Sequence, residues 1–365
     1  MKKSEKEFFG AFDLVDWPKI PDADVTAVVL CHNEALRLPY FLKHHKESGI
    51  GHFLVVDNGS TDGSSDILRD DPDVTLFPST KPYSEFKSIW RELLANHYLV
   101  GKWACFPDVD ELLVHPTWQK ESLPAYLARL DAHNYECLLT IMVDMYPSDE
   151  EDTNYMPGQP FLDYAPYFDA GNYRLDYYRR KKLRSELPTP AVRFRGGARE
   201  RMFHKHTMHH GVPFEVRLNK YIFPLTNSFE PKWTWRLLHN VFRPFLDRMV
   251  SKPGLPNMSK VPLIRWKEGC GFRGGVHRLT KKMNVSPDLG ALLHFKYLSD
   301  FSERVEYNIS RAQHDRGGAH YQLYSEVSQK GAKMQFHFDG TYRFDGIESL
   351  ERVHLVRNVL GKHTV

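Results

Sequence analysis

Two carboxylates two positions apart, Asp108 and Asp110, are the residues whose types and spacing most directly suggest chemistry. They stand in the segment PDVDELLV, directly after a short apolar run at residues 103–106. Side chains at positions i and i+2 of a strand project to the same face, so both carboxylates can reach one small volume if strand geometry continues. Two close negative charges repel unless a cation lies between them, and Mg²⁺ or Mn²⁺ takes such oxygen ligands. The spacing indicates a divalent-metal site; the alternative is an ordinary acidic loop tip.

Alternating strands and helices are expected to position these carboxylates. Apolar, β-branched runs predict strands at residues 26–31, 53–56, 74–77 and 103–107, and apolar residues at helical spacing predict helices at residues 35–48 and 84–98. Such alternation is typical of right-handed β-α-β units. The sequence therefore predicts an α/β fold with a Rossmann-like, mostly parallel sheet and flanking helices.

Three polar clusters follow the predicted strands. They are the triplet His32, Asn33 and Glu34, the turn at residues 57–62, and the acidic segment at residues 108–111. Ligands of open parallel sheets bind beyond the carboxyl ends of the strands, where all three clusters are expected. Asn33 and Glu34 are also ordinary helix-capping residues, so that reading stays open for them.

The remaining segments predict a helix at residues 122–133, a long strand at residues 136–146 and two helices at residues 300–330, broken at Gly317 and Gly318. We expect residues 147–190 and 231–266 to be irregular, because prolines and aromatic residues are frequent there. A hairpin is predicted at residues 336–342. Residues 289–298 form an apolar run that contains His294.

The composition is that of an ordinary globular protein, with 365 residues, 41% hydrophobic and 26% charged. No apolar run approaches the roughly 20 residues that span a bilayer, and the polar start predicts no secretory signal. The four cysteines have no zinc-site or disulfide-framework spacing, so we expect a cytoplasmic protein. The net charge of +3 conceals an acidic first half and a basic second half. This asymmetry is expected either for halves that attract each other or for a basic half that meets anions.

Several of these segments together resemble one enzyme family. An apolar strand followed by His-Asn-Glu, then FLVVDNGSTDGS, then PDVDELLVHP is similar to the GT-A nucleotide-sugar glycosyltransferases, in particular a family 2 branch with an Asp-x-Asp-Glu-Leu-Leu motif. The match covers residues 25–116 closely. Farther along, VRFRGGARERMF, KVPLIRW and LLHFKYLSDF also resemble that branch.

The resemblance implies a division of the chain and a reaction. The polar residues 1–24 are expected to form a leader. The resemblance then implies a nucleotide-sugar-binding half at 25–120, an acceptor-binding half at 121–298, and a C-terminal helical and hairpin extension at 299–365. The implied reaction moves a sugar, with inversion, from a nucleotide-diphosphate sugar, most often a UDP-sugar, to a hydroxyl of a glycan or a lipid-linked saccharide.

The resemblance also implies roles for individual residues. The residues that would bind the nucleotide sugar are His32, Asn33, Glu34, Asp57 and Asp108. The residues that would bind a Mn²⁺ or Mg²⁺ cofactor are Asp108, Asp110 and His294. Glu111 would support these ligands from behind. For Asp57 the alternative is a turn and helix cap. For His294 the alternative is a buried core histidine with satisfied hydrogen bonds.

The basic half supplies further candidates. Arg195, Arg199 and Arg201 flank a glycine pair and can hold a diphosphate or an anionic acceptor, because guanidinium groups bind phosphate bidentately. The alternative is a basic edge strand. Glu200 is the first candidate for the catalytic base and Asp144 the second, and each is also a candidate partner of the arginines. A basic run at residues 179–182 suggests peripheral contact with the inner membrane face, although a solvated patch is the simpler reading.

Other function classes fit less well. A nucleotidyltransferase would carry a glycine-rich phosphate loop after the first strand, and a dinucleotide-dependent oxidoreductase would carry Gly-x-Gly-x-x-Gly; the chain has neither. No recognised nucleic-acid-binding module is present. A catalytically inactive nucleotide- or glycan-binding protein on the same scaffold remains an alternative.

Overall fold

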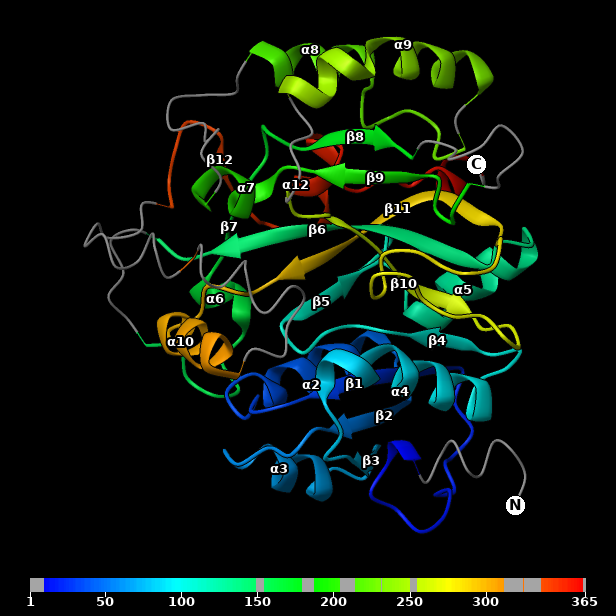
Figure 1. Ribbon diagram of the computed structural model, residues 1–365, viewed down its shortest axis with the longest axis vertical. Helices are drawn as coiled ribbons and strands as arrows, with labels where there is room; N and C mark the ends of the chain where they lie inside the picture. The colour runs from blue at the N-terminus through cyan, green and yellow to red at the C-terminus, as the bar shows by residue number, and fades with distance from the viewer. Residues whose placement is uncertain are drawn as a thin grey trace.

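The computed structural model describes residues 10–148, 154–178, 187–203, 214–230, 232–249, 255–311, 324 and 336–363. Within these ranges the chain forms a ten-stranded mixed sheet with the order β12-β7-β6-β10-β4-β1-β2-β3, and β11 joins it by pairing with β5 and β6. Figure 1 shows the sheet running through the middle of the molecule, with β8 and β9 forming a separate two-stranded sheet near α8 and α9. The predicted α/β class is confirmed.

The first part of the sheet is parallel, as predicted. Strand β1 (Val25–Cys31) pairs in parallel with β2 (His52–Asp57) and β4 (Trp103–Cys105), and β2 pairs in parallel with β3 (Val74–Pro78). All seven residues of β1 are buried, as expected of a central strand whose two faces are covered by helices. The polar residues that follow β1 and β2 therefore meet at one edge of the sheet.

The second part of the sheet is largely antiparallel, which the sequence pattern did not predict. Strand β10 (Ser259–Arg265) lies between β4 and β6 (Cys137–Tyr146) and runs antiparallel to both. Strand β11 (Val285–His294) runs parallel to β6 and antiparallel to β5 (Glu111–Val114). Residues 231–266, expected to be irregular, instead contain β10 and the helix α9 (Trp233–Met249).

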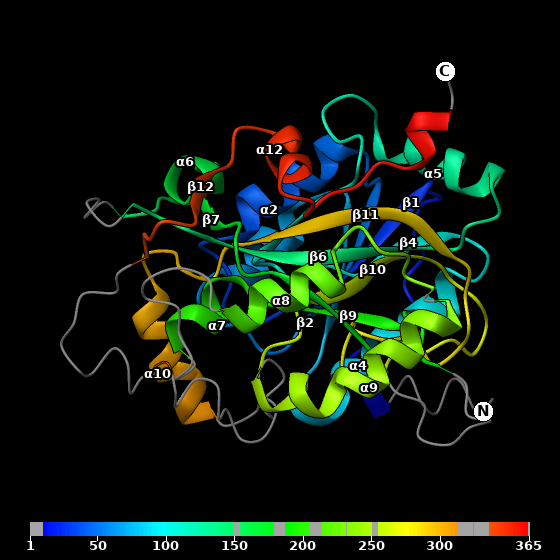
Figure 2. The same ribbon diagram turned by 90° about the horizontal axis from the view of Figure 1, so that it is seen from above.

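Helices cover both faces of the sheet. Figure 2 shows α2 (Leu38–Ser48) and α5 (Leu123–Ala132) on one side, and α4 (Tyr83–Tyr98) and α9 on the other. Helix α2 ends at Gly49, whose φ of 107° is the left-handed conformation that favours glycine. A Cβ at Gly49 would lie 2.5 Å from Cδ of Pro124, so a side chain there would collide with the start of α5.

The other elements are short. They are α3 (Ser64–Asp70), α6 (Phe161–Tyr164), β7 (Tyr167–Asp169), β8 (Arg174–Tyr177), β9 (Val192–Arg195), α7 (Gly197–Phe203), α8 (Phe214–Ile222), α10 (Phe301–Arg311), β12 (Thr341–Arg343), α12 (Ile347–Arg352) and the 3-10 turn at Leu360–His363.

Two expectations about the less regular segments are wrong. Residues 147–190 contain two strands and a helical turn rather than only irregular chain. The hairpin predicted at residues 336–342 does not form, because β12 pairs with β7 instead of with a neighbouring strand. The predicted helix pair at residues 300–330 is confirmed only as α10, since most of the second helix lies outside the described residues.

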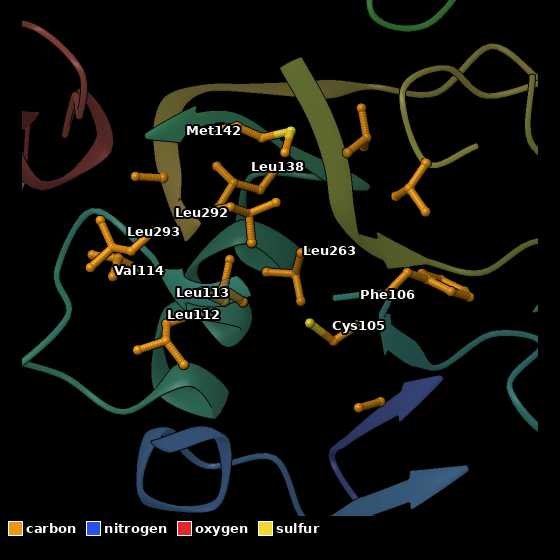
Figure 3. Close-up of a cluster of buried hydrophobic side chains, with 14 of the residues drawn as sticks. Cys105, Phe106, Leu112, Leu113, Val114, Leu138, Met142, Leu263, Leu292 and Leu293 are labelled. Carbon is orange, nitrogen blue, oxygen red and sulfur yellow. The ribbon is translucent and has the colours of Figure 1, made fainter. Parts of the chain in front are cut away.

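The core lies where the two parts of the sheet meet. Figure 3 shows its side chains converging from β4 and the residue after it, and from β5, β6, β10 and β11; they are Cys105, Phe106, Leu112, Leu113, Val114, Leu138, Met142, Leu263, Leu292 and Leu293. All four cysteines are buried free thiols. Among the described residues, no helix combines the length and the apolar character needed to cross a membrane.

Candidate functional site

A cleft of about 1220 Å³ opens at the sheet edge where the polar clusters were expected. It is lined by His32, Asn33 and Glu34 from the end of β1, by residues 108–111, and by side chains from α4, β9, β10 and α10. Lysine and arginine outnumber aspartate and glutamate among the described residues that line it. A cleft of this charge favours an anionic ligand.

The cleft holds one compact group of metal-ligand side chains among the described residues: Asp110, Glu111 and His294. One ligand atom from each lies within 4.8 Å of the others. Nε2 of His294 is 3.4 Å from Oδ2 of Asp110. Strand pairing produces this proximity, because His294 at the end of β11 is the register partner of Glu111 at the start of β5. The backbone N–H of Phe295 also donates to the carbonyl of Asp110 at 2.7 Å.

The imidazole of His294 is held from behind by Asp144. The two residues are register partners on β11 and β6, and Nδ1 of His294 donates to Oδ1 of Asp144 at 2.8 Å. The Asp144 side chain is fully buried and also accepts from Nε of Arg199. Burial alone would raise the pKa of Asp144, but the charges of Arg199 and His294 hold it at about 2. A carboxylate in this position fixes the ring so that Nε2 points toward Asp110.

The surroundings of Asp110 keep its carboxylate ionised, which is the form that binds a metal ion. Burial acts to raise its pKa, but the charge of the adjacent His294, together with the charges of Arg304 and Lys296, holds the pKa well below its usual range. Burial likewise acts to lower the pKa of His294, while Asp110 and Asp144 raise it above its ordinary value. Each group therefore stabilises the charge of its neighbour.

Asp108 occupies a different position from the one the motif suggested. Strand β4 ends at Cys105, so Asp108 lies in the turn before β5 rather than on a strand that continues to Asp110. Its Oδ1 accepts from Arg91 at 2.7 Å and its Oδ2 accepts from Lys260 at 2.5 Å. Asp108 lies outside the compact ligand group, and Glu111, expected only in support, lies inside it.

Lys260 links Asp108 to Glu111. Its Nζ donates to Oε1 of Glu111 at 2.5 Å and to Oδ2 of Asp108 at the same distance. Burial acts to lower the pKa of this lysine, but the two carboxylates raise it above its usual value. The backbone N–H of Asp108 donates to Oε2 of Glu111, so both oxygens of Glu111 already have partners. Asp110 and His294 are therefore the two groups most available to a cation.

These donors fit a divalent ion of the Mn²⁺ type. Carboxylate oxygen and imidazole nitrogen are ligands that such ions accept, and the buried Asp144 behind His294 is the arrangement that commonly orients a metal-binding histidine. Arg195 and Arg199 were expected at a phosphate site, and both line the cleft.

Helix α10 packs against the loop that follows β1. The terminal nitrogens Nη1 and Nη2 of Arg304 donate to the two carboxylate oxygens of Glu34, at 2.7 and 2.8 Å. Arg37 forms an equivalent bidentate pair with Asp300. Nε2 of His32 lies 2.7 Å from the hydroxyl of Tyr307, and the two rings stack. The end of β1 that was predicted to meet a nucleotide is therefore covered by α10.

The loops after β1 and β2 are tied to each other. Asn33 has a left-handed φ of 55°, and its Oδ1 accepts from the backbone N–H of Thr61. Asp57 accepts from the N–H and the hydroxyl of Ser60 and from the hydroxyl of Ser65. It does not line the cleft within the described chain. The contacts of Asp57 are those of the turn alternative, and its nucleotide role stays a prediction.

The two candidate bases are engaged elsewhere. Glu200 pairs with Arg174 at 2.9 Å and accepts from the backbone N–H of Gly196. The glycine is required at this turn, because its φ is 112° and a Cβ would lie 2.4 Å from the carbonyl oxygen of Asn172. Neither Glu200 nor Asp144 is among the described residues that line the cleft. By contrast, Glu303 lines the cleft and forms no ion pair within the described chain.

The sequence pattern did not single out several residues of the site. Three of them are single polar residues of helical segments outside any motif, namely Arg91, Arg304 and Tyr307. The fourth is Lys260, which stands in KVPLIRW; that segment contributes to the family resemblance, but no role was expected for its lysine. The one available signal was a lysine inside an apolar run, since buried lysines require charged partners.

The chain was also compared with known proteins. No protein-family model matches it, and no curated protein matches it either. The functional argument therefore depends on the residues of the cleft themselves.

Proposed function

We propose that this protein is a divalent-metal-dependent glycosyltransferase that moves a sugar from a nucleotide-diphosphate sugar to a hydroxyl acceptor with inversion. The observation that carries the proposal is the pair Asp110 and His294, with Asp144 behind the imidazole, at the edge of an α/β sheet and inside a cleft rich in cations. The GT-A scaffold, the UDP-sugar donor and the saccharide acceptor are parts of the same proposal.

Each group in the cleft has a task in this reaction. Asp110 and His294 would hold the metal, which supplies positive charge against the diphosphate as it departs. Lys296 lines the same cleft and acts electrostatically on Asp110, so it adds positive charge there; Arg304 also acts on Asp110 while it is paired with Glu34. His32 and the loop after β1 would contact the nucleoside after α10 moves away from the end of β1.

The acceptor hydroxyl needs a proton acceptor. Glu200 and Asp144 were expected in this role, but Arg174 and Arg199 occupy them. We therefore propose Glu303 as the base, since it faces the cleft without an ion-pair partner in the described residues. Removal of a general base slows transfer by about 10²- to 10⁴-fold, so Glu303→Gln should show that loss in kcat. Unchanged kcat in Glu303→Gln would remove it from this role.

A thermal-shift experiment tests the proposal. UDP should raise the melting temperature in the presence of Mn²⁺ and much less in its absence, because a ligand that binds only the folded state stabilises it by mass action. Asp110→Ala should lose the Mn²⁺-dependent part of the shift. Asp70→Ala, at the exposed end of α3, is the matched control and should retain it. Full retention in Asp110→Ala, or no nucleotide effect in the unaltered protein, would count against the function.

A further inference from the structure

Arg195 is a buried cation without a carboxylate partner among the described residues. It is 8% exposed and lines the cleft. Its Nη1 donates to the backbone carbonyls of Leu255 and Pro256, and its Nε has no hydrogen-bond partner. A buried charge with unmet hydrogen-bonding capacity is costly unless a counter-ion joins it. The buried charge of Arg195 therefore favours the binding of an anion that is not part of the chain.

The carboxylates nearest to Arg195 are already neutralised. Arg195 lies on the same face of β8 and β9 as Asp176, which Arg193 contacts at 2.5 Å and His239 at 3.0 Å. Glu200 is paired with Arg174. Arg195 is consequently the guanidinium of this face whose charge is not balanced by an adjacent carboxylate.

Two more arginines extend this positive surface along the cleft wall. Arg273 directly precedes Gly274 and Gly275, Arg278 follows three positions later, and neither arginine forms an ion pair within the described part of the chain. A Cβ built on Gly274 would meet Nη2 of Arg278 at 3.7 Å and one built on Gly275 would meet His277 at 3.8 Å, so neither glycine is crowded by the described residues. Both arginines line the cleft together with Arg195.

An aromatic ring completes the wall. The guanidinium of Arg193 lies 5.2 Å from the centre of the Tyr178 ring, and that of Arg278 lies 5.3 Å from it. Stacking of this kind holds arginine side chains in place. The N–H groups of Arg193 are bound to Asp176, whereas Arg278 forms no ion pair in the described residues and can bind an anion.

We propose that Arg195, Arg273 and Arg278 form an anion subsite that binds a phosphate group carried by the acceptor. This assignment rests on the proposed function and names the class of its acceptor: a saccharide or lipid that bears a phosphate monoester close to the reacting hydroxyl. A phosphate monoester is a dianion with three acceptor oxygens, which matches several guanidinium groups lacking carboxylate partners.

The proposed subsite is built from other elements than the metal-ligand group. The charges that act most strongly on Arg195 are Arg193, Asp176 and Arg174 from β8 and β9, and Glu200 from α7. Those that act most strongly on Asp110 are His294, Arg304 and Lys296. Arg195 and Tyr178 thus come from β9 and the position directly after β8, whereas Asp110 lies just before β5 and His294 at the end of β11.

Calorimetric titration with the full-length protein tests this assignment. With UDP and Mn²⁺ at saturation, glucose 6-phosphate serves as a soluble phosphate probe and octyl phosphate as a lipid-headgroup probe, each compared with uncharged glucose or octyl glucoside. The phosphate probes should bind and the uncharged ones should bind much less. The probe that binds more tightly identifies the source of the phosphate.

Variants assign the binding to these residues. Arg195→Gln should weaken phosphate-probe binding by roughly tenfold or more, since charge-assisted hydrogen bonds are lost, while UDP affinity stays the same. Because Arg195 is buried, Arg278→Gln provides a second variant on the cleft wall with the same expected direction. Arg69→Gln, on the exposed part of α3, is the matched control.

Three results would overturn the anion subsite. The first is no phosphate binding at all, and the second is phosphate binding that neither variant weakens. The third is an equal loss of UDP affinity in Arg195→Gln and Arg278→Gln, which would assign these arginines to the donor. A different result would overturn only the proposed function: if phosphate binds through Arg195 without nucleotide but UDP and Mn²⁺ never bind, the anion site stands and its acceptor role is wrong.

Discussion

His294 and Asp144 are register partners on two neighbouring parallel strands, and Nδ1 of His294 donates to Oδ1 of Asp144 at 2.8 Å. On the other side of β11, His294 is the register partner of Glu111. A row of three polar residues thus crosses three adjacent strands at the edge of the sheet. The histidine in the middle of this row has one nitrogen fixed and the other directed toward Asp110.

Asp144→Asn tests whether this row orients a metal ligand. Loss of a carboxylate behind a metal-binding histidine typically lowers metal affinity by about 10- to 100-fold, and we expect that range for Mn²⁺ measured by calorimetry. Asp169→Asn is the matched control, because Asp169 is an equally buried carboxylate that pairs with Arg201. If a folded Asp144→Asn variant binds Mn²⁺ like the unaltered protein, Asp144 does not serve the metal site.

Lys260→Met tests the buried link between Asp108 and Glu111. Removing one partner of a buried ion pair leaves uncompensated charge, which costs about 3–5 kcal/mol of unfolding free energy. Urea denaturation measures this loss. Lys46→Met is the control: Lys46 also pairs with two aspartates but is 29% exposed, so its loss should cost about 0–1 kcal/mol. Similar costs for the two variants would show that burial does not strengthen the Lys260 contacts.

Glu34→Gln tests how α10 is held over the end of β1. The change removes a bidentate ion pair with Arg304, so we expect amide hydrogen exchange at residues 301–311 to accelerate by roughly 10- to 100-fold. Asp66→Asn, which removes the exposed pair with Arg69, should leave α10 unchanged. Unaltered exchange in Glu34→Gln would mean that the pairs at Arg37 and Tyr307 suffice to hold the helix.

The buried histidines of α2 should make stability depend on pH. Burial lowers the pKa of His44 to about 4 and that of His45 to about 3, well below the ordinary value of 6.5. Nδ1 of His45 can donate to the carbonyl of Phe41 while its Nε2 accepts from the N–H of Leu113, which suits only the neutral ring.

The sign of this dependence follows from proton binding. Below pH 6.5 these histidines become protonated in the unfolded chain but stay neutral in the folded protein. The free energy of unfolding therefore falls as the pH decreases, by about 1.4 kcal/mol per pH unit for each histidine. The loss ends near the folded pKa values. His45→Gln should reduce the slope between pH 6 and 5 in urea denaturation. An unchanged slope would show that His45 does not contribute to it.

The sequence predicted the parallel part of the fold because each of its elements carries a local signal. Strands β1 and β2 are short apolar runs, and the turn at Gly49 ends a helix whose apolar spacing is regular. Strand β10 carries no local signal for its place in the sheet. Its position between β4 and β6 depends on pairing between residues more than a hundred positions apart. Long-range pairing of that kind leaves no periodic pattern in the chain.

The candidate site was also predictable only in part. Asp110 and His294 were expected together through a family resemblance, and strand register brings them to 3.4 Å. The position of Asp108 was not predictable, because it depends on Lys260, a residue 152 positions away in the chain. Likewise, the partner of Glu200 is set by β8, which lies in a segment expected to be irregular.

Diffraction from crystals soaked with Mn²⁺ and UDP tests the central claim most directly. The account predicts an anomalous peak for manganese within about 2.0–2.4 Å of a carboxylate oxygen of Asp110 and of Nε2 of His294, with the diphosphate of UDP completing the coordination. A manganese peak that avoids both residues, or UDP bound while Asp110 and His294 stay in contact with no ion between them, would contradict it.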